Sequence, residues 1–289
     1  MKKILAMLLA LVMVLSLAAC ASTQPAAEPA ASSDAPAESG KTYTVGVCQL
    51  VQHEALDAAT QGFVDALKEA LGDAVTIDVQ NASGDSVNCG TIVNGFVAKG
   101  VDLIMANATP ALTAAVSATA DIPILGTSIT AYGVALDIDD FSGTVGGNVS
   151  GTSDLADLQK QAQMILDWFP ETKTVGLLFC SAEPNSRYQI DEVRKALEAQ
   201  GVTCEEFAFT DSNDVSSVAQ KAADFSDVVY IPTDNTAASN TEAIANVLIP
   251  AGVPAICGEE GLCRGCGVAT LSISYYDLGV TTGKMAAKI

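Results

Sequence analysis

The chain is poor in positive charge and has a single histidine. Its 289 residues include 14 Lys and Arg against 34 Asp and Glu, which gives a formal net charge of −20 at pH 7. Nucleic-acid binding depends on clustered Lys and Arg, so this shortage argues against nucleic acid as a partner. It also argues against a protein that lies flat on anionic lipid, while an acidic surface says little about a small ligand.

The scarcity of histidine restricts catalysis. A Ser-His-Asp or Cys-His site would have to use His53, and the sequence has no identifiable partner nucleophile and no Gly-x-Ser-x-Gly elbow. Residues 143–148 are rich in glycine but spell neither a Walker nor a dinucleotide-binding fingerprint. We therefore predict that the protein is not an enzyme and uses no cofactor. For His53 itself, a ligand contact and a packing role at a helix start both stay open.

The cysteines do not form a recognisable framework. Apart from Cys20, seven remain: Cys48, Cys89, Cys180, Cys204, Cys257, Cys263 and Cys266. An odd number at irregular spacing does not match a disulfide scaffold. In an exported protein thiols normally pair, whereas an anaerobic habitat could leave them reduced, and the sequence leaves both states open.

Cys263-Arg264-Gly265-Cys266 is a CxxC motif. A zinc site needs a fourth ligand, and the sequence offers neither a second CxxC nor a histidine pair. A redox-active CxxC is expected at the start of a helix after a strand, whereas we expect this one in a glycine-rich loop before a strand. We therefore predict no metal site, and favour a local disulfide or unreactive thiols.

The first forty residues have the pattern of an export signal followed by a spacer. Lys2 and Lys3 precede an apolar run over residues 4–15, as in a secretory signal, and the run is too short to span a bilayer, which needs about 20 residues. Leu17-Ala18-Ala19-Cys20 resembles the lipobox of bacterial lipoproteins, which implies that Cys20 is acylated; a plain signal peptide or an uncleaved anchor helix is the alternative. Residues 1–20 are thus predicted to be a lipoprotein signal peptide. Residues 21–41 are predicted to be a disordered tether, because residues 21–40 have no large apolar side chain.

Strand-like and helix-like patterns alternate through the rest of the chain. Strands are predicted over 43–48, 75–80, 101–107 and 122–126, and helices over 54–71, 86–99 and 110–119. The first helix repeats apolar residues at three- and four-residue steps. This alternation predicts an α/β fold with a parallel sheet and helices on both faces.

The same order occurs twice. Val45-Gly46-Val47 is matched by Val175-Gly176-Leu177, and Asp121-Ile122-Pro123-Ile124 by Gly252-Val253-Pro254-Ala255. We therefore predict two Rossmann-like lobes with parallel sheets: an N-terminal lobe over 42–154, to which 275–289 return, and a C-terminal lobe over 155–274. Ligands bind beyond the carboxyl ends of such strands, and two lobes can close on a solute by hinge motion.

The loops after the predicted strands are polar. Asp85, Thr109 and Asn235 fit ordinary helix N-caps. Free N–H groups at helix starts also suit a ligand carboxylate, and Asp234, Glu183 or Asp85 suits an ammonium group. The pattern predicts a small polar solute, such as an amino acid, a sugar or a nucleoside.

A series of motifs over residues 43–289 resembles one family, the ABC transporter substrate-binding lipoproteins that include tryptophan- and tyrosine-binding members. The motifs are Asn81-Ala82-Ser83-Gly84-Asp85, Ala108-Thr109-Pro110-Ala111, Asn148-Val149-Ser150-Gly151-Thr152-Ser153-Asp154, Glu183-Pro184-Asn185-Ser186, Pro232-Thr233-Asp234-Asn235-Thr236 and Tyr275-Tyr276-Asp277-Leu278-Gly279. The resemblance implies a type I periplasmic-binding-protein architecture without catalysis, and permease and ATPase subunits as partners. It also implies that Ala108, Thr109, Ser128, Asn185, Ser186, Asp234 and Asn235 lie at or beside the site. To these we add Gln52, His53, Asp85, Thr130 and Glu183 as candidate ligand-binding residues.

The sequence departs from the family pattern in two cleft loops. Glu54 follows His53 where the family commonly has proline, and Ala131-Tyr132 replaces an Asp-Pro pair, which weakens the expectation of an aromatic ligand. Tyr132 and Tyr275 are candidates for stacking on a ligand ring or for half-buried packing. Family members continue for some tens of residues beyond the helix that begins near Tyr275, and the sequence leaves open whether this chain is a C-terminally truncated fragment.

We therefore predict an extracytoplasmic lipoprotein, held to the membrane by its lipid alone, that captures a small solute, an amino acid, for an ABC importer. The alternatives are a sensory lipoprotein that docks on a membrane receptor, a carrier of a nucleoside or sugar, and an exported thiol-dependent enzyme. Neither the identity of the solute nor the choice between transport and sensing follows from the sequence.

Overall fold

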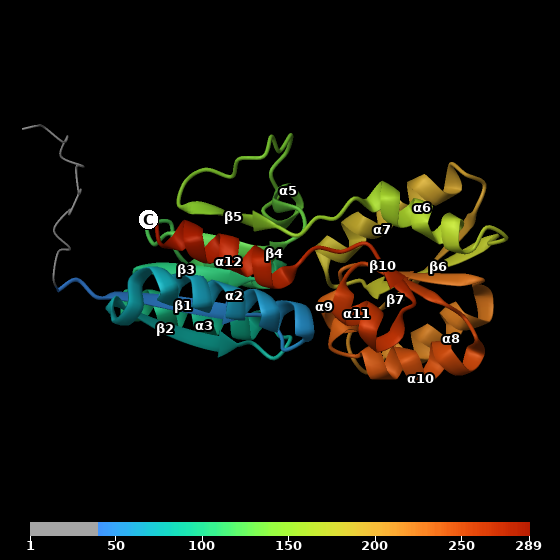
Figure 1. Ribbon diagram of the computed structural model, residues 1–289, viewed down its shortest axis with the longest axis horizontal. Helices are drawn as coiled ribbons and strands as arrows, with labels where there is room; N and C mark the ends of the chain where they lie inside the picture. The colour runs from blue at the N-terminus through green and yellow to red at the C-terminus, as the bar shows by residue number, and fades with distance from the viewer. Residues whose placement is uncertain (1–39) are drawn as a thin grey trace, which may run out of the picture. The chain divides into compact units, whose positions relative to one another are not determined.

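The structure is a computed structural model that describes residues 40–289 of the chain (Figure 1). The predicted signal peptide, the acylated Cys20 and all but the last two residues of the predicted tether lie outside the described residues. Within the described part, every helix is too short or too polar to cross a membrane.

The first lobe contains a five-stranded sheet with the order β2-β1-β3-β4-β5, in which all paired strands are parallel. Its strands are β1 (Tyr43–Gln49), β2 (Val75–Asn81), β3 (Leu103–Asn107), β4 (Ile124–Ile129) and β5 (Val149–Ser153). The helices between them are α2 (Glu54–Leu71), α3 (Ser86–Lys99), α4 (Thr109–Ala118) and the short α5 (Tyr132–Ala135), with a 3-10 turn η1 (Gly72–Ala74) after α2. Helix α2 buries Leu56, Ala59, Phe63 and Leu67 on one face, as its three- and four-residue apolar spacing predicts.

The second lobe repeats this topology. Its sheet has the order β10-β9-β8-β6-β7, again with parallel pairing, and read from β7 this is the same 2-1-3-4-5 order. Its strands are β6 (Thr174–Cys180), β7 (Thr203–Phe209), β8 (Val228–Ile231), β9 (Ala255–Cys257) and β10 (Ala269–Thr270). Its helices are α6 (Leu158–Trp168), α7 (Pro184–Glu198), α8 (Val215–Phe225), α9 (Asn235–Ala238), α10 (Thr241–Ala251) and α11 (Glu260–Cys266).

Each sheet buries apolar side chains on both faces, where helices cover it. In the first lobe one cluster is built around Phe96 and Ile104, and a second around Phe63, Met105 and Leu125. In the second lobe the two clusters contain Phe209 and Leu248 on one side and Phe179, Ile190 and Tyr230 on the other. The predicted fold class, two parallel-sheet α/β lobes, is confirmed.

Two local predictions were wrong, and one strand was not predicted. Strand β4 begins at Ile124 instead of 122 because Pro123 has no N–H to donate to a neighbouring strand. Strand β5 was not predicted, since its sequence Val-Ser-Gly-Thr-Ser lacks an apolar alternation, as an edge strand can. The CxxC does not lie in a loop: it lies in α11, whose start is fixed by the Glu259 carboxylate accepting from the N–H groups of Gly261 and Leu262.

The last helix, α12 (Tyr275–Ala286), lies on the first lobe, side by side with α2 (Figure 1). Glycines on both helices allow this close approach, because a Cβ at Gly62 would overlap the backbone oxygen of Tyr276, and one at Gly279 the backbone oxygen of Ala59. Thr282 Oγ1 also lies 2.8 Å from Thr152 Oγ1 of β5. The C-terminal helix therefore packs against both α2 and the edge of the first sheet.

This crossing gives a stability test. Gly279→Ala should lower the free energy of unfolding by roughly 3 kcal/mol, because the added methyl overlaps backbone that cannot rotate away. Gly95→Ala in α3 is the control: a Cβ there meets no atom within 4 Å, so it should raise stability by about 1 kcal/mol through helix propensity. Urea unfolding measures both, and equal effects of the two substitutions would contradict the close packing of α2 on α12.

Candidate ligand-binding site between the lobes

Residues from both lobes surround a small polar cavity. Both lobes belong to one unit, Gly40–Ile289, and the carboxyl ends of β4, β5 and β8 contribute to the cavity wall. The cavity has a volume of about 10 Å³ and is lined by His53, Leu56, Ser128, Thr130, Asp154, Asn185, Thr233, Asp234, Asn235, Ala238, Glu259 and Tyr275. This volume corresponds to room for about one water molecule, so the lobes are closed on each other here.

Four buried polar atoms on this lining have no hydrogen-bond partner among the described residues: His53 Nδ1, Ser128 Oγ, Asp154 Oδ1 and Asn185 Oδ1. Buried polar groups in native proteins are nearly always paired, so four such atoms around one cavity mark it as a place for a polar group. The amide oxygen Asn185 Oδ1 accepts hydrogen bonds and cannot donate them. The same holds for Asp154 Oδ1 when the carboxylate is ionised.

The tautomer of His53 follows from its neighbour Asn235. The Asn235 Nδ2 group donates to Glu183 Oε2 at 2.7 Å, which leaves Asn235 Oδ1 as the acceptor 3.3 Å from His53 Nε2. His53 Nε2 therefore carries the proton and Nδ1 is a free acceptor. Burial lowers the pKa of His53, although the bond to Asn235 and the charge of Glu183 act the other way, so the ring is neutral near pH 7.

Asp154 is the buried carboxylate at the end of β5. Its Oδ2 accepts a hydrogen bond of 2.7 Å from the Tyr275 hydroxyl at the start of α12, and its Oδ1 has no partner. Burial raises the pKa of Asp154, and the hydrogen bond from Tyr275 opposes this rise only in part. The site thus contains a buried carboxyl group whose ionisation depends on what lies against Oδ1.

Two residues beside the cavity have strained backbone. Ser128, in β4, has φ +55°, and Ala108, directly after β3, has φ +87° and ψ 158°. Residues other than glycine rarely adopt these conformations, and such strain is concentrated at functional sites. The structure holds both residues at the carboxyl ends of adjacent strands, where the sheet edge meets the other lobe.

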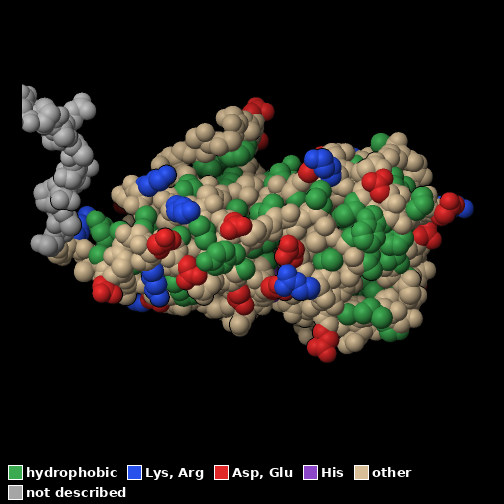
Figure 2. All heavy atoms as spheres, viewed as in Figure 1, with side chains coloured by type: hydrophobic (Ala, Val, Ile, Leu, Met, Phe, Trp, Pro, Cys, Tyr) green, Lys and Arg blue, Asp and Glu red, His purple; other side chains and the backbone are tan. Residues whose placement is uncertain are grey.

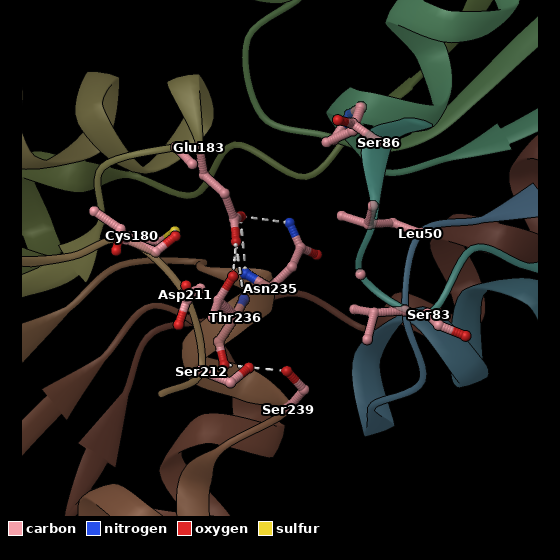
Figure 3. Close-up of a pocket in the computed structure, with 15 residues that line it drawn as sticks. Leu50, Ser83, Ser86, Cys180, Glu183, Asp211, Ser212, Asn235, Thr236 and Ser239 are labelled. Atoms are coloured by element: carbon pink, nitrogen blue, oxygen red, sulfur yellow. Dashed lines mark hydrogen bonds between the residues drawn. The ribbon is translucent and has the colours of Figure 1, made fainter. Parts of the chain in front are cut away.

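Glu183 and Asp234 fix the short helix α9 and have no capacity left for a ligand. Glu183 accepts from the N–H and side chain of both Asn235 and Thr236 at 2.7–3.0 Å (Figure 3). Asp234 accepts from Cys180 N at 2.6 Å, Ser186 Oγ at 2.8 Å and Ala237 N at 2.8 Å. Burial, with the nearby charge of Glu183, raises the pKa of Asp234 to about 8.

The N-terminus of α4 offers donors instead. Its N-cap residue is Ala108, which has no side chain to cap the helix, and Pro110 stands in the first turn. The first N–H groups of a helix have no partner within the helix and carry partial positive charge. The backbone N–H of Thr109 therefore lies at an anion-binding helix start, where Pro110 has no N–H to donate. This helix start lies next to the other lobe's Ala182 and Pro184.

A second, larger space adjoins the polar cavity at Asn235. It has a volume of about 220 Å³ and lies between Leu50, Val51, Ser83, Gly84, Ser86 and Pro110 of the first lobe and Cys180, Ala182, Glu183, Thr210, Asp211, Ser212, Asn235, Thr236 and Ser239 of the second. In Figure 3 the labelled first-lobe residues Leu50, Ser83 and Ser86 face the labelled second-lobe residues across this space. This compartment is the candidate site for the remainder of a ligand whose polar group lies in the polar cavity.

The structure distributes the twelve residues predicted from sequence among several roles. His53, Ser128, Thr130, Asn185, Asp234 and Asn235 line the polar cavity, Glu183 lines the larger compartment, and Thr109 lies at the α4 start. Ser186 is buried and donates to Asp234, and Ala108 is the buried N-cap of α4. Gln52 is exposed, and Asp85 is an exposed N-cap that accepts from Val87 N at 2.8 Å.

Sequence reasoning did not name Leu56, Asp154, Thr233, Ala238 or Glu259 as ligand-binding candidates, and treated Tyr275 as a candidate for stacking or for half-buried packing. Tyr275 instead donates to Asp154, and the Tyr132 hydroxyl donates to the backbone oxygens of Gly126 and Thr152. The available signal was the motif that ends at Asp154, because an aspartate at the end of a strand is poorly explained by packing.

Other chemistry is not suggested by the described residues. Among residues 40–289, His, Cys, Asp and Glu side chains nowhere gather in threes with the geometry of a metal site. The seven cysteines in this part are all free thiols. Burial raises the pKa of Cys180, Cys204 and Cys263, so these thiols are poor nucleophiles. On the face shown in Figure 2, basic side chains are few and scattered among acidic ones, without a continuous basic patch.

Two similar α/β lobes closed on a polar cavity define a solute-binding protein of the periplasmic-binding class. Residues 44–289 match the family described as ABC transporter substrate binding protein. The tyrosine-binding protein of Clostridioides difficile (strain R20291) is 32% identical over 295 residues, covering all of this chain and 84% of that protein. The chain therefore belongs to the family of ABC transporter substrate-binding proteins, whose members bind solutes outside the cytoplasm for ABC importers.

Two solved structures show how related chains are arranged. The ABC domain in complex with L-Trp from Streptococcus pneumonia is 34% identical, with a TM-score of 0.82 over 86% of this chain and 84% of that one. A ligand-free, open structure of a substrate-binding protein with adhesive properties from Clostridium difficile is 35% identical over the same shares, but its TM-score is 0.61. At equal identity and coverage, the present structure is thus more similar to the L-Trp complex than to the open form.

The pKa of Asp154 gives a pH test. A carboxyl whose pKa is raised on folding binds more protons in the native than in the unfolded chain between its usual value, 3.8, and its folded value. Stability should therefore fall as pH rises through this window. Asp154→Asn keeps the bond from Tyr275 and removes the titration, so its thermal midpoint should vary less with pH. Parallel pH profiles for both proteins would contradict the burial of an ionisable Asp154.

Proposed function

We propose that the protein binds a single L-α-amino acid between its lobes and delivers it to the permease of an ABC importer. The observation that carries this proposal is the set of unpartnered atoms around the polar cavity. His53 Nδ1, Asp154 Oδ1 and Asn185 Oδ1 are acceptors, and Ser128 Oγ is a hydroxyl. An ammonium group has three donors and no acceptor, so it complements this set, whereas a sugar hydroxyl or a carboxylate complements it less well.

The ammonium of the ligand is placed against Asp154, where a buried carboxylate gains most from a cation. The carboxylate of the ligand is placed at the uncapped start of α4, where the first turn offers the backbone N–H of Thr109. The remaining acids support this division of roles, because Glu183, Asp234 and Glu259 each accept hydrogen bonds from backbone N–H groups.

The side chain of the ligand is placed in the larger compartment. Its volume of about 220 Å³ lies below the range of roughly 300–1,000 Å³ typical of drug-sized ligands, which favours one amino acid over a peptide. Leu50, Val51, Pro110 and Ala182 provide apolar contact, and Asp211 and Ser212 provide polar groups. An aromatic amino acid is the proposed ligand, supported by the tyrosine-binding relative and the L-Trp complex.

The transport role rests on family membership and on the N-terminal sequence. We propose that Cys20 is acylated and anchors the chain, that a permease and an ATPase are its partners, and that the protein carries out no catalysis. A thermal-shift screen of the twenty amino acids, with nucleosides and sugars alongside, tests the ligand class, since a ligand that binds only the native state raises its apparent stability. A response to nucleosides or sugars but to no amino acid would refute the proposal.

Asp154→Asn tests the ammonium contact. Loss of a charged hydrogen bond costs about 2 kcal/mol, so the dissociation constant for L-tyrosine should rise roughly thirty-fold at pH 7.5. In the wild type, affinity should fall as pH drops below the raised pKa of Asp154. Protonation removes the negative charge of Asp154, while the ammonium group of the ligand keeps its positive charge. The variant should show little pH dependence. Isothermal titration calorimetry measures both, and unchanged affinity in the variant would exclude Asp154 as the ammonium partner.

Ser128→Gly separates stability from binding. Glycine relieves the backbone strain at φ +55° and removes a buried hydroxyl without a partner, so the unliganded protein should gain about 1 kcal/mol of stability. Affinity for L-tyrosine should fall, since the hydroxyl is one of the four groups around the ammonium. Urea unfolding and calorimetry provide the two readouts. A variant that is less stable than the wild type, or that binds more tightly, would contradict this role of Ser128.

A further inference from the structure

An ion pair joins the two lobes outside the polar cavity. Glu54 is the first residue of α2 in the first lobe, and Arg264 lies in α11 of the second. Arg264 Nη1 donates to Glu54 Oε1, while Arg264 Nη2 donates to Glu260 Oε2 at 3.1 Å. The guanidinium thus bridges a carboxylate on its own helix and a carboxylate on the opposite lobe.

The two chain segments that carry this pair are in close contact. A Cβ at Gly261, in the first turn of α11, would lie 3.1 Å from Glu54 Cβ, so the two segments are in close contact and a side chain here would fit only if Glu54 shifted slightly. His53, the residue before Glu54, lines the cavity and lies 3.3 Å from Asn235 of the other lobe. The ion pair is therefore one residue away from a cavity-lining contact and depends on the same approach of the lobes.

We infer that Glu54 and Arg264 form a latch that stabilises the closed arrangement and thereby sets how tightly and how long a ligand is held. Apparent affinity depends on the fraction of protein in the binding-competent state, so an interaction made only between closed lobes acts on affinity without touching the ligand. The part of this inference that concerns ligand release rests on the proposed function.

The size of the effect follows from exposure. The side chains of Arg264 and Glu54 are 64% and 48% exposed, and exposed ion pairs contribute little to stability. The latch therefore changes affinity a few-fold and does not decide whether a ligand binds. It is also sensitive to ionic strength, because charges in water are screened within about 10 Å at 0.1 M salt and about 3 Å at 1 M.

The test measures release of L-tyrosine, the probe, by stopped-flow at low salt. Glu54→Gln and Arg264→Gln should each raise the dissociation rate constant roughly two- to five-fold. The double variant should be no faster than either single one, because both changes remove the same interaction. The charge swap, with Glu54→Arg and Arg264→Glu together, should restore slow release. At 1 M salt the wild type and the variants should release the ligand at similar rates.

Two control variants match the chemistry without crossing between lobes. Glu260→Gln removes the partner of Arg264 on its own helix, and Glu192→Gln removes an exposed pair with Lys195 within α7, at 2.6 Å. Both should keep the wild-type dissociation rate. The latch is overturned if Glu54→Gln releases ligand at the wild-type rate, if the two single effects add in the double variant, or if Glu260→Gln releases ligand as fast as Glu54→Gln.

Small-angle X-ray scattering of the unliganded protein separates the latch from the ligand assignment. Loss of the pair should raise the radius of gyration of Glu54→Gln above that of the wild type, because more molecules are open. If this happens although no amino acid binds, the latch stands and the proposed function fails. If amino acids bind but neither release nor the radius of gyration changes, the latch fails and the proposed function stands.

Discussion

The arrangement of this protein depends on the rule that polar atoms removed from water need hydrogen-bond partners. Closing the lobes buries His53 Nδ1, Ser128 Oγ, Asp154 Oδ1 and Asn185 Oδ1 around one cavity. Each such atom costs roughly 1–3 kcal/mol when it stays unpaired. A ligand group with several donors removes this cost, and a group without donors does not. Under the proposed function, closure and recognition are therefore one event, and the selectivity of the site follows from the predominance of acceptors on its wall.

A rigid frame keeps these atoms in place. Glu183, in the loop after β6, accepts hydrogen bonds from Asn235 and Thr236 of α9. Asp234, in the loop after β8, accepts from Cys180 at the end of β6 and from Ala237 of α9. These bonds tie α9 to the second sheet. In the first lobe, the Tyr275 hydroxyl orients Asp154 from α12. Binding groups held by a surrounding shell of hydrogen bonds lose less entropy on binding. The acids that looked most suited to a ligand thus serve the frame, and a less conspicuous acid faces the cavity.

The fold could be predicted from the sequence because each lobe repeats the same local pattern of strand, helix and turn. The repeat extends to single bonds: Thr44 N donates to Asp102 at 2.7 Å, and Thr174 N donates to Asp227 at 2.9 Å, at equivalent places in the two sheets. Pattern also predicted that polar loops meet at the carboxyl ends of the strands. It could not predict which side chains face the cavity, because Glu183 and Asp154 differ only in which donors reach them after folding. Likewise the glycine-rich CxxC has the composition of a loop, but after folding the Glu259 carboxylate caps a helix that starts there.

Two neighbouring residues illustrate how affinity and kinetics are divided. His53 lies at the polar cavity, where water is excluded and a lost contact is expensive, whereas Glu54 reaches the exposed seam, where an ion pair is weak and screened. Under the proposed function, a change at His53 alters which solutes are accepted. Under the proposed latch, a change at Glu54 alters how long any accepted solute stays, since the exposed ion pair makes no contact with it. A receptor that hands its ligand to another protein needs moderate holding, and a weak, solvent-exposed pair can be adjusted by single substitutions without rebuilding the polar cavity.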